Sequence, residues 1–484
     1  MIRFPLLLAL LAAPLAAKPN IIVILTDDLG YADLACQGQE KDVFTPNLDR
    51  FAAQGIRCTA GYTTAPQCSP ARAGLLTGRY QQRIGIDTIP DMPLGTEEVL
   101  IPEMLKPAGY NSGMVGKWHL EPNPTCEAWL AKNLPDAPKG PKGTVAIPNR
   151  MRLAFFPQAQ GFDRYFTGEM GSYHANFTLA GEPREPGPLA AKGFRIDLQT
   201  DAALAFIRGH HQAPFFLYLP YFAPHTPLEA PPKYAARFTE KMPVRRRAAL
   251  SMIAGIDHGV GRILDTLAEL GIDDNTLLVF TSDNGAPVHG RRDSPLNTDP
   301  GGWDGSLNTP WVGEKGMLAE GGIRVPFLIR WKGKLPAGKV SDYPVSTLDL
   351  AATARAAAGL PADPRLDGID LVPALTGATP PQRALHWRFW NQIAIRDGKW
   401  KYLKASGGPD MLFDLESPEH EKKNLASEHP EILAKLRARS DAWAATLQPA
   451  GAPKGKPVGQ EIHWYQEYFQ VQLGGSKPST PPRK

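Results

Sequence analysis

The strongest constraint on the fold is a set of short, continuous apolar runs with polar residues directly after them. The first run, Asn20–Thr26, is bounded by Pro19 and Asp27. A strand with one face in water alternates apolar and polar residues, so an unbroken β-branched run indicates a strand buried on both faces, as in parallel sheets. Similar runs occur later in the chain at Pro214–Pro220, Thr276–Thr281 and Val325–Trp331.

Helical patterns lie among these runs, at Pro46–Gln54, Leu250–Leu270 and Val345–Ala358. Strands that alternate with helices predict an α/β fold, with a large mixed, mainly parallel sheet sandwiched by helices. Ligand sites of such sheets lie outside the carboxyl ends of the strands. We therefore expect the chemistry in the residues that follow each apolar run.

The pattern changes near residue 381. Apolar residues around the turn Arg396–Lys399 predict a hairpin, Met411–Leu415 a short strand, and Pro430–Leu447 a helix. We expect a catalytic domain over residues 18–380 and a smaller antiparallel sheet with one helix over residues 381–484. The tail from Pro449, including the aromatic patch His463–Phe469, is expected to be a loosely held extension.

Two further segments differ in composition from the rest of the chain, one at the N-terminus and one rich in Pro and Lys. Arg3 and the apolar run Phe4–Ala17 are typical of a signal peptide over residues 1–17, because the run is shorter than the roughly 20 residues of a membrane span. An uncleaved anchor or a buried first helix is the alternative. We expect export to the periplasm or the medium, without stable membrane insertion. The Pro- and Lys-rich stretch Leu134–Pro148 predicts a loop or insertion.

Charge and cysteine content narrow the function classes. A formal net charge of +4 is too small to indicate nucleic-acid binding. The chain has four cysteines in an expected oxidising compartment. If Cys68 is consumed by chemistry, at most one disulfide forms among Cys36, Cys58 and Cys126, and the sequence leaves the pairing open.

Carboxylates and one carboxamide follow two of the apolar runs. Asp27 and Asp28 come directly after the first run, and Asp283 and Asn284 follow Thr276–Thr281. Together they form an all-oxygen set suited to a hard divalent cation, calcium or magnesium. Taken singly, the same residues are common in helix caps and turns.

The most specific signal is Cys68-Ser69-Pro70-Ala71-Arg72, continuing through Leu76-Thr77-Gly78-Arg79. It resembles the signature of formylglycine-dependent sulfatases, the type I sulfatases of the alkaline phosphatase superfamily, and in particular exported bacterial sulfatases of sulfated glycans. Ala71 replaces a serine of many relatives but lies outside the Cys, Pro and Arg of the core signature. Further motifs follow in the family's order: Gly116–His119, Ala223–Pro227, Thr281–Gly285, Lys315-Gly316 and Glu320–Pro326.

The resemblance implies a cofactor and a partner. A formylglycine-generating enzyme would oxidise Cys68 to an aldehyde, whose hydrate attacks the sulfur of a sulfate ester. One divalent cation, Ca²⁺ in the first place and Mg²⁺ as the alternative, would be held by residue 68 and the oxygen ligands Asp27, Asp28, Asp283 and Asn284.

The resemblance also implies roles for the remaining motif residues. Lys117 and Lys315 would bind the sulfate oxygens and stabilise the charge of the transition state. His225 would protonate the leaving oxygen, and His119 would take a proton from the hydrate so that sulfate is expelled. Arg72 would hold the loop of the nucleophile.

Candidate substrate residues lie in two loops. A sugar subsite is expected from residues that can stack on a pyranose or pair with its hydroxyls: His174, His289, Arg291, Arg292, Trp303 and Asp304. An irregular surface loop that these residues merely stabilise is the alternative.

The predicted activity is release of inorganic sulfate from a sulfated polysaccharide or oligosaccharide. A phosphatase or phosphonate monoester hydrolase of the same superfamily is the first alternative, and a non-catalytic glycan-binding relative is the second. The cysteine signature argues against the first, and the retained catalytic motifs argue against the second. The sequence gives no indication of the oligomeric state, the sugar or the position of the ester.

Overall fold

The computed structural model describes residues 18–89, 92–298, 302–377, 379–405, 407–450 and 459–473. The predicted signal peptide, residues 1–17, lies outside the described residues. Within the described part of the chain, no helix is long and apolar enough to cross a membrane.

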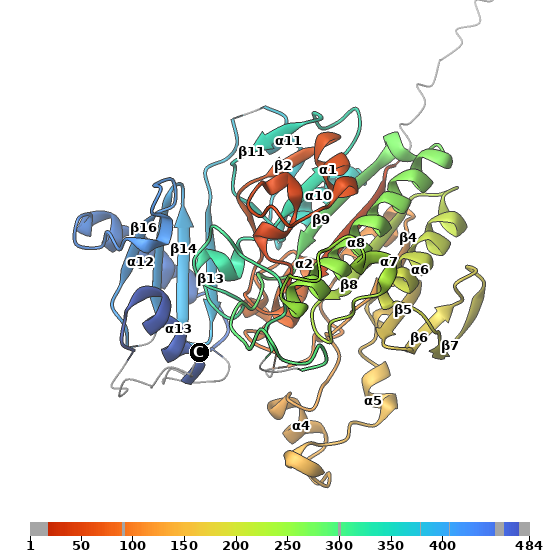
Figure 1. The fold of residues 1–484 in the computed structure, drawn as a ribbon, viewed down its shortest axis with the longest axis horizontal. Coiled ribbons are helices and arrows are strands. Elements are labelled where there is room, and N and C mark those ends of the chain that lie inside the picture. Colours follow the sequence, from red (N-terminus) through yellow and green to blue (C-terminus); the bar gives the residue numbers. More distant parts are fainter. Residues whose placement is uncertain are drawn as a thin grey trace, which may run out of the picture.

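One large sheet forms the centre of the molecule (Figure 1), with the strand order β11-β2-β10-β9-β1-β8-β4-β5-β6-β7. Its strands are β1 (Asn20–Asp27), β2 (Ile56–Cys58), β4 (Asn111–Gly116), β5 (Arg164–Glu169), β6 (Ser172–Phe177), β7 (Pro183–Ala190), β8 (Phe215–Pro224), β9 (Thr276–Ser282), β10 (Phe327–Arg330) and β11 (Lys339–Ser341). A small pair, β3 (Gly61–Tyr62) and β12 (Val345–Ser346), lies outside it. The block β9-β1-β8-β4-β5 is parallel throughout, which confirms the predicted mainly parallel sheet.

One apolar run pairs differently from the others. The run Val325–Trp331 contains β10, which lies antiparallel to both β9 and β2. An unbroken apolar run reports burial on both faces, and burial does not fix the direction of the strand. The likeness of this run to parallel strands was therefore misleading.

Helices cover both faces of the sheet (Figure 1). The α-helices of the described residues are α1 (Pro46–Ala53), α2 (Cys68–Thr77), α3 (Ile101–Leu105), α4 (Glu127–Asn133), α5 (Asn149–Leu153), α6 (Arg195–His210), α7 (Pro232–Ala235), α8 (Val244–Glu269), α9 (Glu320–Ile323), α10 (Asp349–Ala357), α11 (Leu371–Leu375), α12 (Pro430–Ala444) and α13 (Gly459–Phe469). The helix predicted at Val345–Ala358 begins only at Asp349, because Val345 and Ser346 form β12 and the Asp349 carboxylate accepts a hydrogen bond from the Ser346 N–H at 2.8 Å.

The two cores follow from the two faces of each strand. In β1, Ile22 and Ile24 pack with α1, α6 and α8, whereas Ile21, Val23 and Leu25 pack with α2, α3, α10 and α11. Successive side chains of a strand point to opposite faces, so an unbroken apolar strand contributes to both cores. Each fully buried Ile or Leu stabilises the fold by about 1.5–3 kcal/mol, which holds the carboxyl ends of the central strands in place.

The C-terminal segment forms an antiparallel sheet, β13 (Ala384–Phe389), β14 (Gln392–Asp397), β15 (Trp400–Ala405) and β16 (Met411–Asp414). The predicted hairpin is β14–β15, and α12 covers one face of the sheet through Leu436. The expectation of a loosely held tail was wrong for residues 459–469. They form α13, whose Trp464 and Tyr465 are buried against the other face, because an apolar sheet face needs a cover.

A projecting segment carries α4 and α5 (Figure 1). It includes the predicted insertion and has a small core of its own around Trp129, Leu130 and Val145. Cys126 belongs to this core, and all four cysteines of the chain are free thiols in the structure.

Candidate active site

The predicted cation ligands meet at the carboxyl ends of two neighbouring strands. Asp27 ends β1 and Asp28 follows it, whereas Asp283 and Asn284 come directly after β9. One oxygen each of Asp27, Asp28 and Asp283 and the Cys68 Sγ lie within 4.8 Å of one another. The Asn284 side-chain N–H donates to Asp28 Oδ1 at 2.6 Å, while Asn284 Oδ1 is buried and has no hydrogen-bond partner among the described residues. This oxygen-rich donor set with an orphaned carbonyl oxygen fits a hard divalent cation.

The backbone at the site is strained. Asp28 has φ 65° and His119 has φ 60°, in the left-handed region that non-glycine residues avoid. Such conformations cost about 1–3 kcal/mol each and persist where the surroundings impose them. At Asp28 the backbone N–H donates to Asp283 Oδ1 at 3.2 Å, which ties the two strand ends together.

Cys68 is the first residue of α2, and its side chain points into this carboxylate cluster. Its Sγ lies 3.2 Å from Asp27 Oδ1 and 4.0 Å from Asp28 Oδ1, and the residue is 1% exposed. Burial, and then the charges of Asp27 and Asp283, raise the pKa of the Cys68 thiol well above its ordinary value. Because the thiolate is the nucleophilic form, unmodified Cys68 is a poor nucleophile.

Three cations pair with the three carboxylates. Arg72 Nη2 lies 2.6 Å from Asp283 Oδ2, and its Nη1 donates to the Lys117 carbonyl at 2.9 Å. Lys117 Nζ lies 2.6 Å from Asp27 Oδ2, and Lys315 Nζ lies 2.7 Å from Asp28 Oδ2. These charges balance, so a bound divalent cation would leave an excess of positive charge for an anionic substrate.

The pKa values of two carboxylates move in opposite directions. Burial would raise the pKa of Asp27, but Lys117 and His225 outweigh it and hold the pKa well below its ordinary value. Burial and the neighbouring Asp27 and Asp28 raise the pKa of Asp283 to about 7 despite the Arg72 charge. A divalent cation would relieve this repulsion.

Two histidines complete the centre. His225 Nδ1 lies 2.7 Å from the Thr226 carbonyl, which can only accept, so Nδ1 carries a proton and Nε2 faces Asp28 Oδ2 at 3.7 Å. Burial lowers the pKa of His225. Burial, Lys117 and Arg72 lower the pKa of His119 well below its ordinary value, and its Nδ1 is buried without a hydrogen-bond partner. His119 is therefore a neutral imidazole that can accept a proton.

The comparisons with known proteins decide the family. Residues 19–360 match the family model described as Sulfatase.

This chain belongs to the sulfatase family.

It is 35% identical to N-acetylgalactosamine-6-sulfatase of Mus musculus, over 81% of this chain and 73% of the relative. It is 30% identical to N-acetylgalactosamine-6-O-sulfatase of Bacteroides thetaiotaomicron, over 87% of this chain and 92% of the relative. The crystal structure of Ps i-CgsB in complex with k-i-k-neocarrahexaose is similar over 93% of this chain and 98% of that chain, with 28% identity and a TM-score of 0.73. The chain is thus a sulfuric ester hydrolase, which confirms the family resemblance predicted from its motifs and the fold class predicted from its apolar runs and helical patterns.

A cleft of about 580 Å³ adjoins the catalytic centre of the sulfatase. Its lining includes Lys117 and His119 of the centre, together with Arg152, Glu169 and His174. His174 Nδ1 lies 2.9 Å from the Tyr165 hydroxyl oxygen, and the ring packs edge-on against Phe156 with centroids 5.2 Å apart. His174, the first predicted substrate residue, is thus held in place beside Lys117 and His119.

The other predicted substrate residues do not line this cleft. Asp304 lies with Asp28 and His225, with side-chain atoms of all three within 4.8 Å of one another. Arg291 and Arg292 are exposed. The Arg292 guanidinium lies 4.2 Å from the centroid of the Trp303 ring.

Two predicted substrate residues have other tasks in the structure. Trp303 is 1% exposed and donates from Nε1 to the Ser306 carbonyl at 3.2 Å, so its ring stabilises the loop and is not presented to a sugar. His289 has both ring nitrogens engaged by the carboxylates of Glu314 and Glu467. The sugar subsite expected from the sequence stays a prediction.

Sequence reasoning missed the charged lining of the cleft. Arg152 comes from the projecting segment and lies 3.2 Å from Glu121 Oε1, and Glu169 at the end of β5 pairs with the buried Arg195. Neither Arg152 nor Glu169 stands in a recognisable sequence motif. The Pro- and Lys-rich stretch Leu134–Pro148 predicted a loop or insertion, but it gave no indication that this segment lies near the cleft.

Proposed function

We propose that this sulfatase releases sulfate from a sulfated carbohydrate by means of a formylglycine derived from Cys68. The observation that carries the proposal is the place of the Cys68 Sγ, in the carboxylate cluster and with its thiol pKa raised. The Sγ stands where the oxygens of the hydrated aldehyde would be. Conversion to formylglycine replaces a thiol that burial keeps protonated with a group able to act as nucleophile.

A divalent cation would be held by residue 68 with Asp27, Asp28, Asp283 and Asn284. We propose Ca²⁺, with Mg²⁺ as the alternative, because the donors are oxygens. When bound, the cation supplies positive charge that acidifies the nucleophile and draws electron density from the sulfate oxygens.

The lysines are the protein's own contribution to charge stabilisation. Lys117 and Lys315 point into the cluster from different segments and pair with different carboxylates, so their ammonium groups flank one space. Their side chains are 9% and 19% exposed, so their charges are poorly screened by water. Arg72 is a positioning residue, because it binds Asp283 and the Lys117 carbonyl.

The two histidines suit opposite proton transfers. His225 offers Nε2 to the site, and the negative charge of a bound sulfate would favour a second proton there, which it can pass to the leaving oxygen. His119 is held neutral with a free Nδ1, which suits a base that takes a proton from the hydrate. The ionic environments of the two rings thus agree with an acid and a base.

A carbohydrate substrate is supported by the cleft and by the relatives. The relatives are named for N-acetylgalactosamine 6-sulfate esters, and the similar crystal structure holds k-i-k-neocarrahexaose. The cleft combines Phe222 with charged residues, a lining that suits stacking and hydrogen bonding to a sugar. Within the proposed catalytic domain, residues 18–380, we assign His174 and Asp304 to substrate contacts.

Export of the protein and a formylglycine-generating enzyme as partner complete the proposal. Residues 1–17 would direct export to the periplasm or the medium, and residues 381–484 would form the smaller C-terminal unit.

The test is sulfate release by protein co-expressed with a formylglycine-generating enzyme. N-acetylgalactosamine 6-sulfate, other sulfated saccharides, nitrophenyl sulfate and nitrophenyl phosphate are compared. Activity on a sulfated sugar, with little on the phosphate, is expected. Faster hydrolysis of the phosphate would support the alternative of a phosphatase, and no turnover by fully modified protein would refute the catalytic proposal.

The carbohydrate subsite has its own test. His174→Ala is expected to raise KM for the sugar at least tenfold and to leave nitrophenyl sulfate turnover nearly unchanged, because the cleft residue contacts only the sugar. His211→Ala, at a half-buried histidine directly after α6, is the matched control. Equal losses on both substrates would assign His174 to the fold or the catalytic centre.

A further inference from the structure

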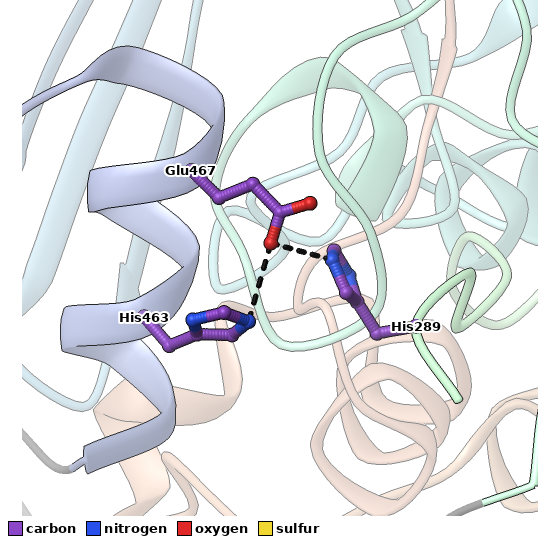
Figure 2. Close-up of side chains that lie close together, drawn as sticks. All are labelled: His289, His463 and Glu467. Atoms are coloured by element: carbon purple, nitrogen blue, oxygen red, sulfur yellow. Dashed lines mark hydrogen bonds and ion pairs between the residues drawn. The ribbon is translucent and has the colours of Figure 1, made fainter. Parts of the chain in front are cut away.

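A second group of side chains that could bind a metal lies outside the cluster of Asp27, Asp28, Cys68 and Asp283. His463 and Glu467 are one turn apart on α13, and His289 faces them from the loop after β9 (Figure 2). Glu467 Oε2 lies 2.8 Å from His289 Nε2 and 3.2 Å from His463 Nε2. Ligand atoms of all three residues lie within 4.8 Å of one another.

These separations suit one small cation. Ligands at about 2.0–2.1 Å from a tetrahedral zinc ion are about 3.3 Å from one another. Two imidazoles and one carboxylate are ligands typical of zinc and similar transition metals, in contrast to the oxygen donors of the catalytic cluster. The side chains of His289, His463 and Glu467 are 33%, 27% and 47% exposed, so an ion can enter and keep a water molecule as a fourth ligand.

A buried carboxylate orients the first histidine. Glu314 is 1% exposed, accepts the backbone N–H groups of Val288 and His289 at 2.7 and 2.8 Å, and contacts His289 Nδ1. A carboxylate on Nδ1 fixes the tautomer whose Nε2 lone pair is directed at a metal, and such outer partners are usual at histidine ligands.

The same cluster without a metal is a proton-bridged ion pair. The hydrogen bond that His289 donates to the Glu314 carboxylate, and further the charges of Glu314 and Glu467, raise the pKa of His289 to about 9. A metal at Nε2 would displace one proton from His289. A proton and a metal are therefore the two competing occupants.

We propose that His289, His463 and Glu467 form a zinc site that fastens α13 to the loops beside the catalytic centre. Glu314 directly precedes Lys315, and the packing of Trp464 against Gly316 joins α13 to the same loop. Metal bound between His289 and α13 would cross-link the C-terminal helix to the segment that positions Lys315. This site is distinct from the proposed Ca²⁺ site in its ligands and in its location.

Zinc binding tests the proposal directly. Tag-free, full-length protein is saturated with Ca²⁺ and titrated with Zn²⁺ against a chromophoric chelator, in wild type and in an Asp283→Asn background that weakens the catalytic site. We expect one zinc equivalent in both. His463→Ala and Glu467→Gln should weaken its binding on the order of 100-fold, whereas His211→Ala should not.

Hydrogen exchange provides a second measurement, independent of activity. Zinc should slow amide exchange in α13 of the wild type at least tenfold and have no effect in Glu467→Gln, which preserves the size of the side chain and the packing of the helix. Absence of a zinc equivalent, or equal affinity in wild type, His463→Ala and Glu467→Gln, would overturn the proposal and leave a proton-bridged ion pair.

Discussion

Removal of the Asp283 charge should stabilise the metal-free protein, although it should also weaken binding of the proposed cation. In metal-free protein the pKa of Asp283 is raised from 3.8 to about 7. The protonated Asp283 carboxyl is therefore favoured in the folded state. Its contribution to stability is fully present below the pKa of the unfolded chain and is lost as the pH rises through about 7. A difference of about 3 pKa units corresponds to about 4 kcal/mol at pH 8.

Asp283→Asn keeps the shape of the side chain and removes the charge. In chelator at pH 8, the variant should melt above wild type by about 4 °C, since the unfolding entropy of a chain of this size is about 1 kcal/mol per degree. At pH 5 the difference should be small. With Ca²⁺ at about a thousand times its Kd, wild type should gain about 4 kcal/mol and the variant much less.

Turnover of Asp283→Asn should be nearly lost at every pH, because a cation ligand and the partner of Arg72 are both changed. The assay is thermal unfolding from pH 5 to 8, with chelator and with Ca²⁺, alongside sulfate release. Asp273→Asn is the matched control. Asp273 is paired with Arg330 at 2.6 Å and has a lowered pKa, so its variant should be destabilised and remain insensitive to pH in this range and to Ca²⁺. A chelated Asp283→Asn protein that melts below wild type at pH 8 would refute the electrostatic argument.

Three further outcomes follow from individual side chains. Cys68→Ala should fold and lose at least about 10⁴-fold in turnover. In active wild type, the mass of the tryptic peptide Cys58–Arg72 should show the aldehyde at residue 68. Full activity of protein that carries only the Cys68 thiol would contradict the mechanism. His225→Ala should slow sugar sulfates far more than nitrophenyl sulfate, whose leaving group needs no acid, and similar losses on both would exclude the acid role. Burial, and then Arg439, lower the pKa of His386 to about 4, so up to about 3 kcal/mol of stability present above pH 6.5 should be lost as the pH falls towards 4. His386→Phe should lack this loss in acid melting curves, and an unchanged pH dependence would assign the effect to another group.

Much of the catalytic centre could be predicted from local sequence. Asp27 and Asp283 directly follow buried apolar strands, and the parallel pairing of β1 with β9 brings the ends of both strands to one edge. Cys68 stands in a motif whose order relative to the other motifs carries the family resemblance. These signals are local because a few consecutive residues are enough to recognise a buried strand or the motif at the start of a helix.

The same local signals did not determine direction or long-range packing. The apolar run of β10 was compatible with either strand direction, and the chain path through the preceding loop decided that it lies antiparallel. The aromatic residues of α13 suggested a surface patch, but the uncovered face of the C-terminal sheet made them a buried helix face.

The sequence by itself determined the class of fold and carried the family motifs around Cys68, because burial patterns and motif spacing are local properties. Tertiary structure alone decided which distant side chains lie together around the cleft and the carboxylate cluster. Arg152 reaches the cleft from a projecting segment, Asp304 joins the catalytic centre from a long loop, and His289 meets Glu467 across 178 residues of chain. Contacts of this kind arise from how whole layers pack, and no periodicity in the chain encodes which distant side chains that packing brings together.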